Sequence, residues 1–160
     1  MKKLLFTFLL LGAFFSANAQ FGVGAGLLYG TDSDFGYFGR LSYKLDSKLS
    51  FNATYSLLHS ESIELFGVEI SAKSSSIDLE ANYALGEQPS HLYVLGGLSI
   101  VMAKATAAGQ SESDSQIGFN VGAGYNIAMS DAFDIFLEGK YSIVKDADQA
   151  IFLAGGRYNF

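Results

Sequence analysis

Apolar and polar residues alternate along almost the whole chain after Gln20. In the segment 21–29 the odd positions are apolar, and three of the four even positions are Gly. Such alternation predicts a β-strand with two different faces. The same pattern recurs in the segments 35–45, 49–57, 77–85, 117–127, 133–143 and 152–160. An eighth segment, 91–103, is apolar at both parities, so its register stays open. The pattern therefore predicts eight strands and no helix.

The connections between these segments alternate in length. Longer connections are expected at 30–34, 59–75, 104–115 and 145–150, and tight turns at 46–48, 86–90 and 129–132. The longer loops would gather at one end of the sheet, and the short turns and both termini at the other. Short periplasmic turns with longer outside loops are typical of transmembrane barrels. We therefore predict an all-β fold, an eight-stranded antiparallel up-and-down transmembrane β-barrel.

Alternation alone does not separate a membrane barrel from a soluble lipocalin-like one, because both have two different faces. An eight-stranded barrel leaves little room inside. One face here carries Phe, Tyr, Leu and Ile, and the other carries Gly, Asn, Ser and a few charges. Small residues fit the concave face, so the bulky apolar face is expected to meet lipid. Aromatic residues lie near the strand ends, as interfacial girdles require: Phe21, Tyr29, Phe35, Tyr43, Tyr83, Phe133, Tyr158 and Phe160.

The first residues have the pattern of an export signal. Lys2 and Lys3 precede an apolar run, 4–15, which is followed by Ala17-Asn18-Ala19. This arrangement predicts a secretory signal peptide, residues 1–19, cleaved after Ala19, and a barrel domain over 20–160 with no further domain after it. The chain has no Cys and a net charge of −6. Disulfides and thiolate metal sites are thus excluded, and nucleic acid is not an expected partner.

Several motifs resemble the small outer-membrane β-barrel domain family, which includes OmpA-type and OmpX-type barrels. The motifs are Gly22-Val23-Gly24-Ala25-Gly26, the repeat 118–125, the strand Phe136-Leu137-Glu138-Gly139-Lys140-Tyr141 and the terminal Arg157-Tyr158-Asn159-Phe160. The resemblance covers the whole chain after the signal. It implies an outer-membrane location. It also implies that Phe160, with Tyr158, is the address read by the barrel-insertion machinery.

Charged residues at inward positions lie at comparable depths. Arg40, Glu80 and Glu138 are each five residues from the turn end of their strands. Lys140 and Asp78 are two residues further on, while Arg157 is lower. Buried charges survive only when paired. We therefore expect a lumen ion-pair cluster, either a plug that braces the barrel or a gate for ions. Its members are Arg40, Asp78, Glu80, Asp134, Glu138, Lys140 and Arg157.

Constellations for catalysis are weak. His59-Ser60-Glu61 is similar to the residue set of lipid-A deacylases, but successive strand residues face opposite sides, so Ser60 would point away from His59 and Glu61. His91 is expected at the other end of the barrel, and no spacing resembles a calcium loop. We expect no enzyme activity, no cofactor and no metal site. A lipid-A-modifying barrel enzyme stays the least favoured alternative.

The loop end is expected to be the working surface. Alternating residues around Gly67 predict a protruding hairpin, whose exposed edge offers pairing to another chain's strand. Its interaction residues would be Ile63, Leu65, Phe66, Val68 and Ile70. The expected role is structural or adhesion-like, and the alternative is a narrow, low-conductance channel. Expected partners are outer-membrane lipid and lipopolysaccharide, the insertion machinery and an extracellular protein.

Overall fold

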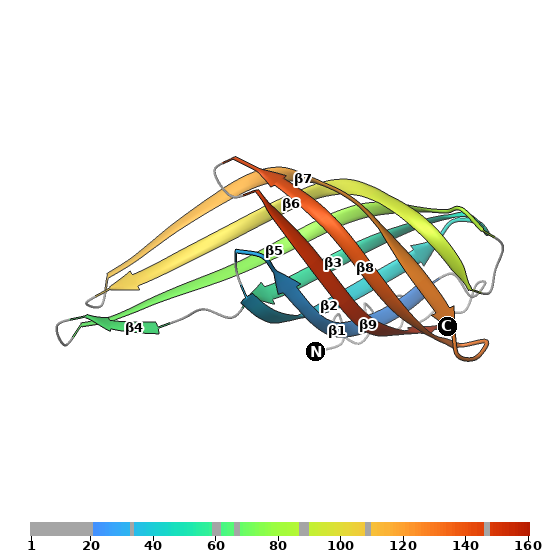
Figure 1. Ribbon diagram of the computed structural model, residues 1–160, viewed down its shortest axis with the longest axis horizontal. Helices are drawn as coiled ribbons and strands as arrows, with labels where there is room; N and C mark the ends of the chain where they lie inside the picture. The colour runs from blue at the N-terminus through green and yellow to red at the C-terminus, as the bar shows by residue number, and fades with distance from the viewer. Residues whose placement is uncertain are drawn as a thin grey trace, which may run out of the picture.

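The computed structural model describes residues 21–32, 34–58, 62–65, 68–86, 90–107, 110–145 and 148–160. The expected signal peptide lies outside these residues. Antiparallel strands make up nearly all of the described chain (Figure 1). Their bounds are β1 (Phe21–Gly30), β2 (Asp34–Lys44), β3 (Leu49–Leu58), β4 (Ser62–Leu65), β5 (Val68–Ala84), β6 (His91–Ala107), β7 (Gln110–Ala128), β8 (Phe133–Val144) and β9 (Gln149–Asn159). Among the described residues there is no helix long and apolar enough to cross a membrane.

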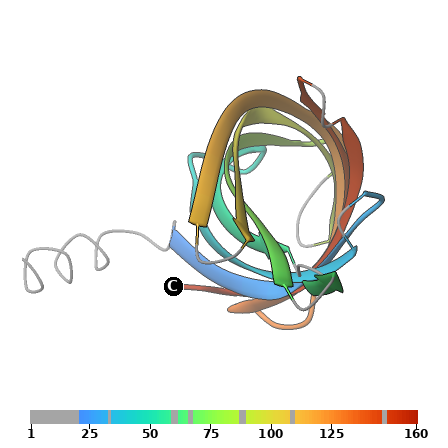
Figure 2. The same cartoon turned by 90° about the vertical axis from the view of Figure 1, so that its left-hand side faces the viewer.

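Every strand except β4 belongs to a closed antiparallel ring, which Figure 2 shows end-on. Within the ring, each strand pairs with the next one along the chain, and β3 pairs with β5 in the register Thr54↔Asp78. The ring closes where β1 pairs with β9, and the Phe160 N–H then donates to the Phe21 carbonyl at 2.9 Å. The predicted eight-stranded up-and-down barrel is confirmed. Closure removes the free edges that an open sheet would expose.

The two faces of the wall differ as expected. Within the ring, the even-numbered residues of β1, β2, β3, β5, β7 and β8 are buried or half-buried, whereas in β6 and β9 the buried residues are odd-numbered. This parity settles the register of β6, with Tyr93 inside and Leu92 outside. The outward face is apolar, and Ile117 and Phe35 are the most exposed of its large side chains, at 72% and 68%. A surface of this kind is stable only against lipid.

Aromatic contacts mark both ends of the wall. At the turn end the Phe21 and Tyr43 ring centroids are 4.9 Å apart, and Tyr158 packs edge-on against Phe160 at 5.2 Å. At the loop end Tyr29 and Phe35 pack at 5.1 Å. These contacts agree with the girdles expected at the two membrane interfaces.

The predicted loop at 104–115 is wrong, because the strands continue through it. Lys104 pairs with Ser113, and Ala107 pairs with Gln110, so β6 and β7 form one long hairpin beyond the barrel. Apolar residues alternate with polar ones only where one face of a strand contacts lipid. Beyond the membrane both faces contact water, so the alternation ends although the backbone hydrogen bonds between the strands continue. In the stretch 59–75, β4 pairs with the start of β5 as a second projecting hairpin (Figure 1).

Candidate functional site in the barrel interior

Arg40 connects strands on opposite sides of the interior. Its Nε donates to Thr54 Oγ1 on the neighbouring β3 at 2.9 Å. Its Nη1 and Nη2 donate to the two carboxylate oxygens of Glu138 on β8, each at 2.9 Å. Two strands, β1 and β9, separate β2 from β8 along the wall. This bidentate pair, the strongest geometry for an Arg and a carboxylate, therefore spans the lumen.

Lys140 makes a second connection across the interior, from β8 to β5. Its Nζ donates to Asp78 Oδ2 at 3.0 Å and to Glu80 Oε1 at 2.6 Å. Asp78 also accepts a hydrogen bond from Ser99 Oγ at 2.5 Å. Each of the three charged side chains is at most 2% exposed. The pairing therefore takes place away from bulk water, where an unpaired charge would cost several kcal/mol.

We call Arg40, Asp78, Glu80, Glu138 and Lys140 the central cluster. It holds two cations and three carboxylates, so its formal charge is negative. The second oxygen of Glu80, Oε2, has no hydrogen-bond partner and lies 3.9 Å from Arg40 Nη2. Arg40 thus has two carboxylates within reach and is fully bonded to one of them.

Gly97 on β6 makes room for part of this network. In the register it lies between Glu80 on β5 and Asn120 on β7. Asn120 Nδ2 donates to Glu80 Oε1 at 2.8 Å, so this hydrogen bond passes over β6 at Gly97. A Cβ at Gly97 would overlap the Leu79 carbonyl oxygen and the Glu80 Cα. The bare backbone is therefore needed for the close approach of β5 and β6 beneath the network.

Arg157 and Asp134 form a separate ion pair nearer the turn end. They are direct register partners in β9 and β8. Arg157 Nη2 and Nε donate to Asp134 Oδ2 at 2.9 and 3.2 Å, and Asn159 Nδ2 donates to the same oxygen at 2.9 Å. All seven charged residues expected in the lumen thus lie in the interior, but they divide into the central cluster and this local pair.

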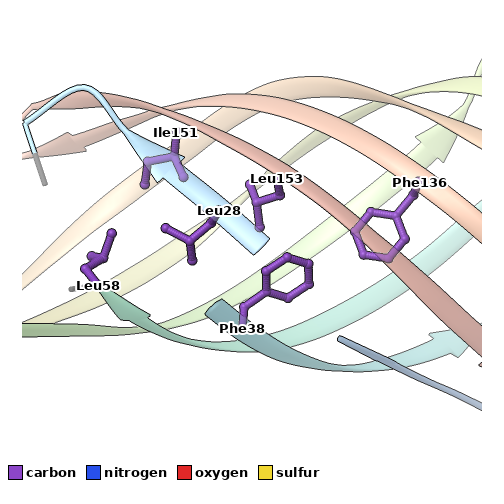
Figure 3. Packing of buried hydrophobic residues seen from close by; sticks show 6 residues of the cluster. All are labelled: Leu28, Phe38, Leu58, Phe136, Ile151 and Leu153. Carbon is purple, nitrogen blue, oxygen red and sulfur yellow. The ribbon is translucent and has the colours of Figure 1, made fainter. Parts of the chain in front are cut away.

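An apolar cluster fills the interior beside the central cluster, and Figure 3 shows its six side chains converging. The guanidinium carbon of Arg40 lies 4.7 Å from the Phe136 ring centroid and 5.5 Å from that of Phe38. The Arg40 charge is therefore stabilised by cation–π contacts as well as by Glu138. The interior apolar cluster comprises Leu28, Phe38, Leu58, Phe136, Ile151 and Leu153.

The interior apolar cluster and Tyr93 were not predicted from the sequence. Tyr93 Oη donates to Glu138 Oε2 at 2.9 Å, so it belongs with the central cluster. Its strand, β6, is apolar at both parities, which hid its inward position. Leu28, Phe38 and Phe136 could have been found, because they are large apolar residues at the even positions of strands whose other even positions, apart from Val144, are small or polar.

The predicted interaction hairpin is present in the backbone. Ile63 pairs with Ile70 and Leu65 pairs with Val68. Phe66 lies outside the described residues, as do the side chains of the other four. The hairpin projects from the loop end, beyond the ring of the barrel (Figure 1).

The residues weighed for catalysis do not come together in the described part of the chain. His59, Ser60 and Glu61 lie outside it. His91 is buried at the turn end, where its Nε2 lies 3.2 Å from Asn126 Nδ2. Across the described ranges, no three His, Cys, Asp or Glu side chains are grouped so that they could hold a metal ion.

A closed ring of amphipathic strands, apolar outside and charged inside, defines a membrane-spanning β-barrel. The chain belongs to the outer membrane protein beta-barrel domain family, whose profile matches residues 5–160. Its location is therefore the outer membrane.

Solved structures share this fold. The N-terminal β-barrel domain of Pseudomonas aeruginosa OprF is 16% identical, with a TM-score of 0.69 over 89% of this chain and 100% of that chain. Neisserial surface protein A is 22% identical, with a TM-score of 0.69 over 90% of this chain and 100% of that one. Ail, the attachment invasion locus protein of Yersinia pestis, in complex with the heparin analogue sucrose octasulfate, is 19% identical, with a TM-score of 0.68 and the same coverage. No curated protein sequence matches the chain.

Proposed function

We propose that the protein is a structural and surface-interaction protein of the outer membrane, adhesion-like in its action, with the loop end as its working surface. The observation that carries the proposal is the unequal length of the strands. β5, β6 and β7 have 17, 17 and 19 residues, whereas β1, β2, β3, β8 and β9 have 10 to 12. A strand needs about 9–11 residues to cross the membrane. The surplus in β5, β6 and β7 therefore stands outside it.

The projecting hairpins supply a surface for an extracellular protein. Among the described strands β4 pairs only with β5, so its other edge offers backbone donors and acceptors for β-augmentation. Surface and attachment proteins among the similar structures, Neisserial surface protein A and Ail, support this role. The charged and apolar interior clusters then serve as bracing that holds the barrel rigid beneath the surface.

Assembly completes the proposal. The leader, residues 1–19, is removed on export, and the insertion machinery recognises Tyr158 and Phe160. Both aromatic side chains face outward, at 51% exposure each. They are therefore accessible to a receptor before the barrel is embedded in lipid.

The experiment replaces residues 62–71 with a short Gly-Ser turn and measures binding of cells displaying the protein to immobilised host cells or matrix. A second variant shortens the β6–β7 hairpin by deleting residues 105–112, which pair in part with the base of the β4–β5 hairpin. Heat-modifiable migration in gels checks that both variants still form the barrel. We expect the first replacement to abolish binding and the second to weaken it. Unchanged binding by both variants would overturn the proposal.

A second candidate is a narrow, low-conductance channel gated by Arg40. The observation favouring it is the unpartnered Glu80 Oε2 at 3.9 Å from Arg40 Nη2, because Arg40 can exchange Glu138 for Glu80. Planar-bilayer recordings of the wild type and Glu80→Gln test it, and channel steps whose frequency depends on Glu80 would support it. A silent membrane with both proteins contradicts it. We do not propose the lipid-A-modifying alternative, which depends on His59, Ser60 and Glu61.

A further inference from the structure

A row of three polar side chains crosses the wall at the turn end. Lys44, the last residue of β2, is at an inward position and is half-buried. Its register partner on β3 is Ser50, and the partner of Ser50 on β5 is Asn82. Within the described ranges, none of these three side chains forms a hydrogen bond or an ion pair. The row therefore has free hydrogen-bonding capacity.

Arg157 reaches the same region from β9. Its Nε and Nη2 donate to Asp134 Oδ2, whereas its Nη1 has no acceptor among the described residues. A Cβ at Gly22 on β1 would come within 3.1 Å of Arg157 Cδ, so this glycine leaves the room that the side chain uses. The charges of Arg157 and Asp134 both act on Lys44. In the described part of the chain, two cations thus lie near each other and only Arg157 has a carboxylate partner.

A cavity of about 20 Å³ lies between these side chains and the turn that joins β2 to β3. This volume holds one species of about the size of a water molecule or a small ion. Three cations line the cavity, namely Lys44, Lys48 and Arg157, and one carboxylate, that of Asp46. Asp46 is exposed in the turn, where its Oδ1 accepts the Lys48 and Leu49 N–H groups. The cavity is therefore cationic on balance.

Asn82 indicates that the cavity is a binding site. Its side chain lines the cavity, it is only 6% exposed, and its Oδ1 has no hydrogen-bond partner. Buried polar groups are almost always paired, and an amide can turn so that its Nδ2 donates. With Lys44, Ser50 and Arg157, it then offers an ammonium, a hydroxyl, an amide and a guanidinium as donors. A cation would be repelled here, and a water molecule would leave the repulsion between Lys44 and Arg157 uncompensated.

We propose that Lys44, Ser50, Asn82 and Arg157 bind one monatomic anion of the size of chloride at the turn end of the barrel. The two positive charges select an anion, and the volume of the cavity selects a halide over phosphate or sulfate. The bound anion links β9 to β2, β3 and β5 and offsets the repulsion between the two cations. The inference is independent of the proposed adhesion-like role, which concerns the opposite end of the barrel.

The first experiment locates the anion by crystallography of the folded barrel in bromide. Bromide has the charge of chloride and a similar size, and its anomalous X-ray signal identifies it. The variants are Lys44→Gln, which removes a charge, and Asn82→Leu, which removes the buried amide. The matched control is Lys145→Gln, which removes an exposed lysine at the loop end. Heat-modifiable migration checks that every variant is folded.

We expect an anomalous peak beside Lys44 Nζ and Arg157 Nη1 in the wild type and in Lys145→Gln, and no peak in Lys44→Gln. Asn82→Leu should also lose the peak, because a leucine side chain fills the cavity without a donor. Absence of the peak from the wild type, or its persistence in Lys44→Gln, would overturn the proposal.

The second experiment measures urea unfolding in lipid vesicles, in sodium chloride and in sodium gluconate at equal ionic strength. Gluconate is too large for the cavity, and a ligand that binds only the folded state raises the unfolding midpoint. We expect chloride, relative to gluconate, to raise the midpoint of the wild type and of Lys145→Gln more than that of Lys44→Gln or Asn82→Leu. The same chloride dependence in all four proteins would contradict specific binding.

Discussion

The central cluster and the Arg157–Asp134 pair are both buried ion pairs, but they connect different parts of the barrel. The Arg40–Glu138 pair joins β2 to β8, and the Lys140 pairs join β8 to β5, across the lumen. Arg157 and Asp134 join β9 to β8, which are already paired through their backbones. The central cluster therefore adds contacts that the hydrogen-bonded wall lacks, whereas the local pair duplicates one that the wall already makes.

This difference indicates that buried ion pairs stabilise a small barrel most when they connect strands that are not paired through their backbones. Backbone hydrogen bonds hold each strand to its neighbours, but they do not set the distance between opposite walls. In this protein that distance is bridged by ion pairs and, beside them, by the interior apolar cluster. We therefore expect changes to the central cluster to affect the whole barrel and changes to the local pair to affect one end.

The largest effect is expected for Arg40→Ala. The substitution removes both Arg40 hydrogen bonds to the buried Glu138 carboxylate, and the hydrogen bond from Tyr93 Oη remains. Lys140 is then the one cation left in the central cluster. Removing one partner of a buried ion pair costs about 3–5 kcal/mol. Urea unfolding in lipid vesicles measures the change in the free energy of unfolding.

The companion variant is Arg40→Ala combined with Glu138→Gln, which removes the charge that the first substitution strands. We expect it to recover part of the lost stability, because a neutral amide costs less to bury than an unpaired carboxylate. A double mutant no more stable than Arg40→Ala would show that the bridging contact, and not the stranded charge, dominates.

A smaller effect is expected for Gly97→Ala, which tests the close approach of the wall beneath the central cluster without removing a charge. The new methyl group would overlap β5 at Leu79 and Glu80. Overpacking of this kind costs about 1–3 kcal/mol. Gly96→Ala is the matched control, because its Cβ would point outward and come no closer than 3.7 Å to the Asn120 carbonyl oxygen. Equal unfolding free energies for the two variants would contradict the role assigned to Gly97.

Arg157→Ala should cost less than Arg40→Ala, about 1–2 kcal/mol, the range for leaving a buried polar group short of a partner. Asp134 Oδ2 keeps the hydrogen bond from Asn159 Nδ2, and the Asp134 side chain, at 10% exposed, is less buried than the carboxylates of the central cluster. The same urea titration in vesicles provides the measurement. A loss as large as that of Arg40→Ala would remove the distinction between local and cross-lumen pairs.

The sequence alone predicts the strands and the depth of the buried charges, but not which charges pair across the lumen. Period-two alternation predicts the strands, and counting from the turn end puts Arg40, Glu80 and Glu138 at similar depth. The alternation does not reveal that Arg40 pairs with Glu138, because that pairing depends on the tilt and stagger of the strands in the closed barrel. The role of Gly97 is hidden for the same reason, since it depends on which residues of β5 and β7 flank it. The extension of β6 past Lys104 escapes detection because no lipid contact imposes a pattern there.

The smallest effect is expected outside both ion-pair groups, at Asp46 in the turn between β2 and β3. The Lys48 and Leu49 N–H groups donate to its Oδ1 at 2.7 and 2.8 Å, and these hydrogen bonds hold the pKa of the Asp46 carboxyl below its ordinary value. A lowered pKa in the folded state means that the carboxylate stabilises the fold above its unfolded-state pKa and that this contribution is lost as the pH falls through the folded-state pKa.

Asp46→Ala should therefore lower the urea midpoint slightly at neutral pH and leave it unchanged in acid. The matched control is Asp131→Ala, in the turn between β7 and β8. A shift for Asp46→Ala that persists at low pH would show that the turn is stabilised by something other than the ionised carboxylate.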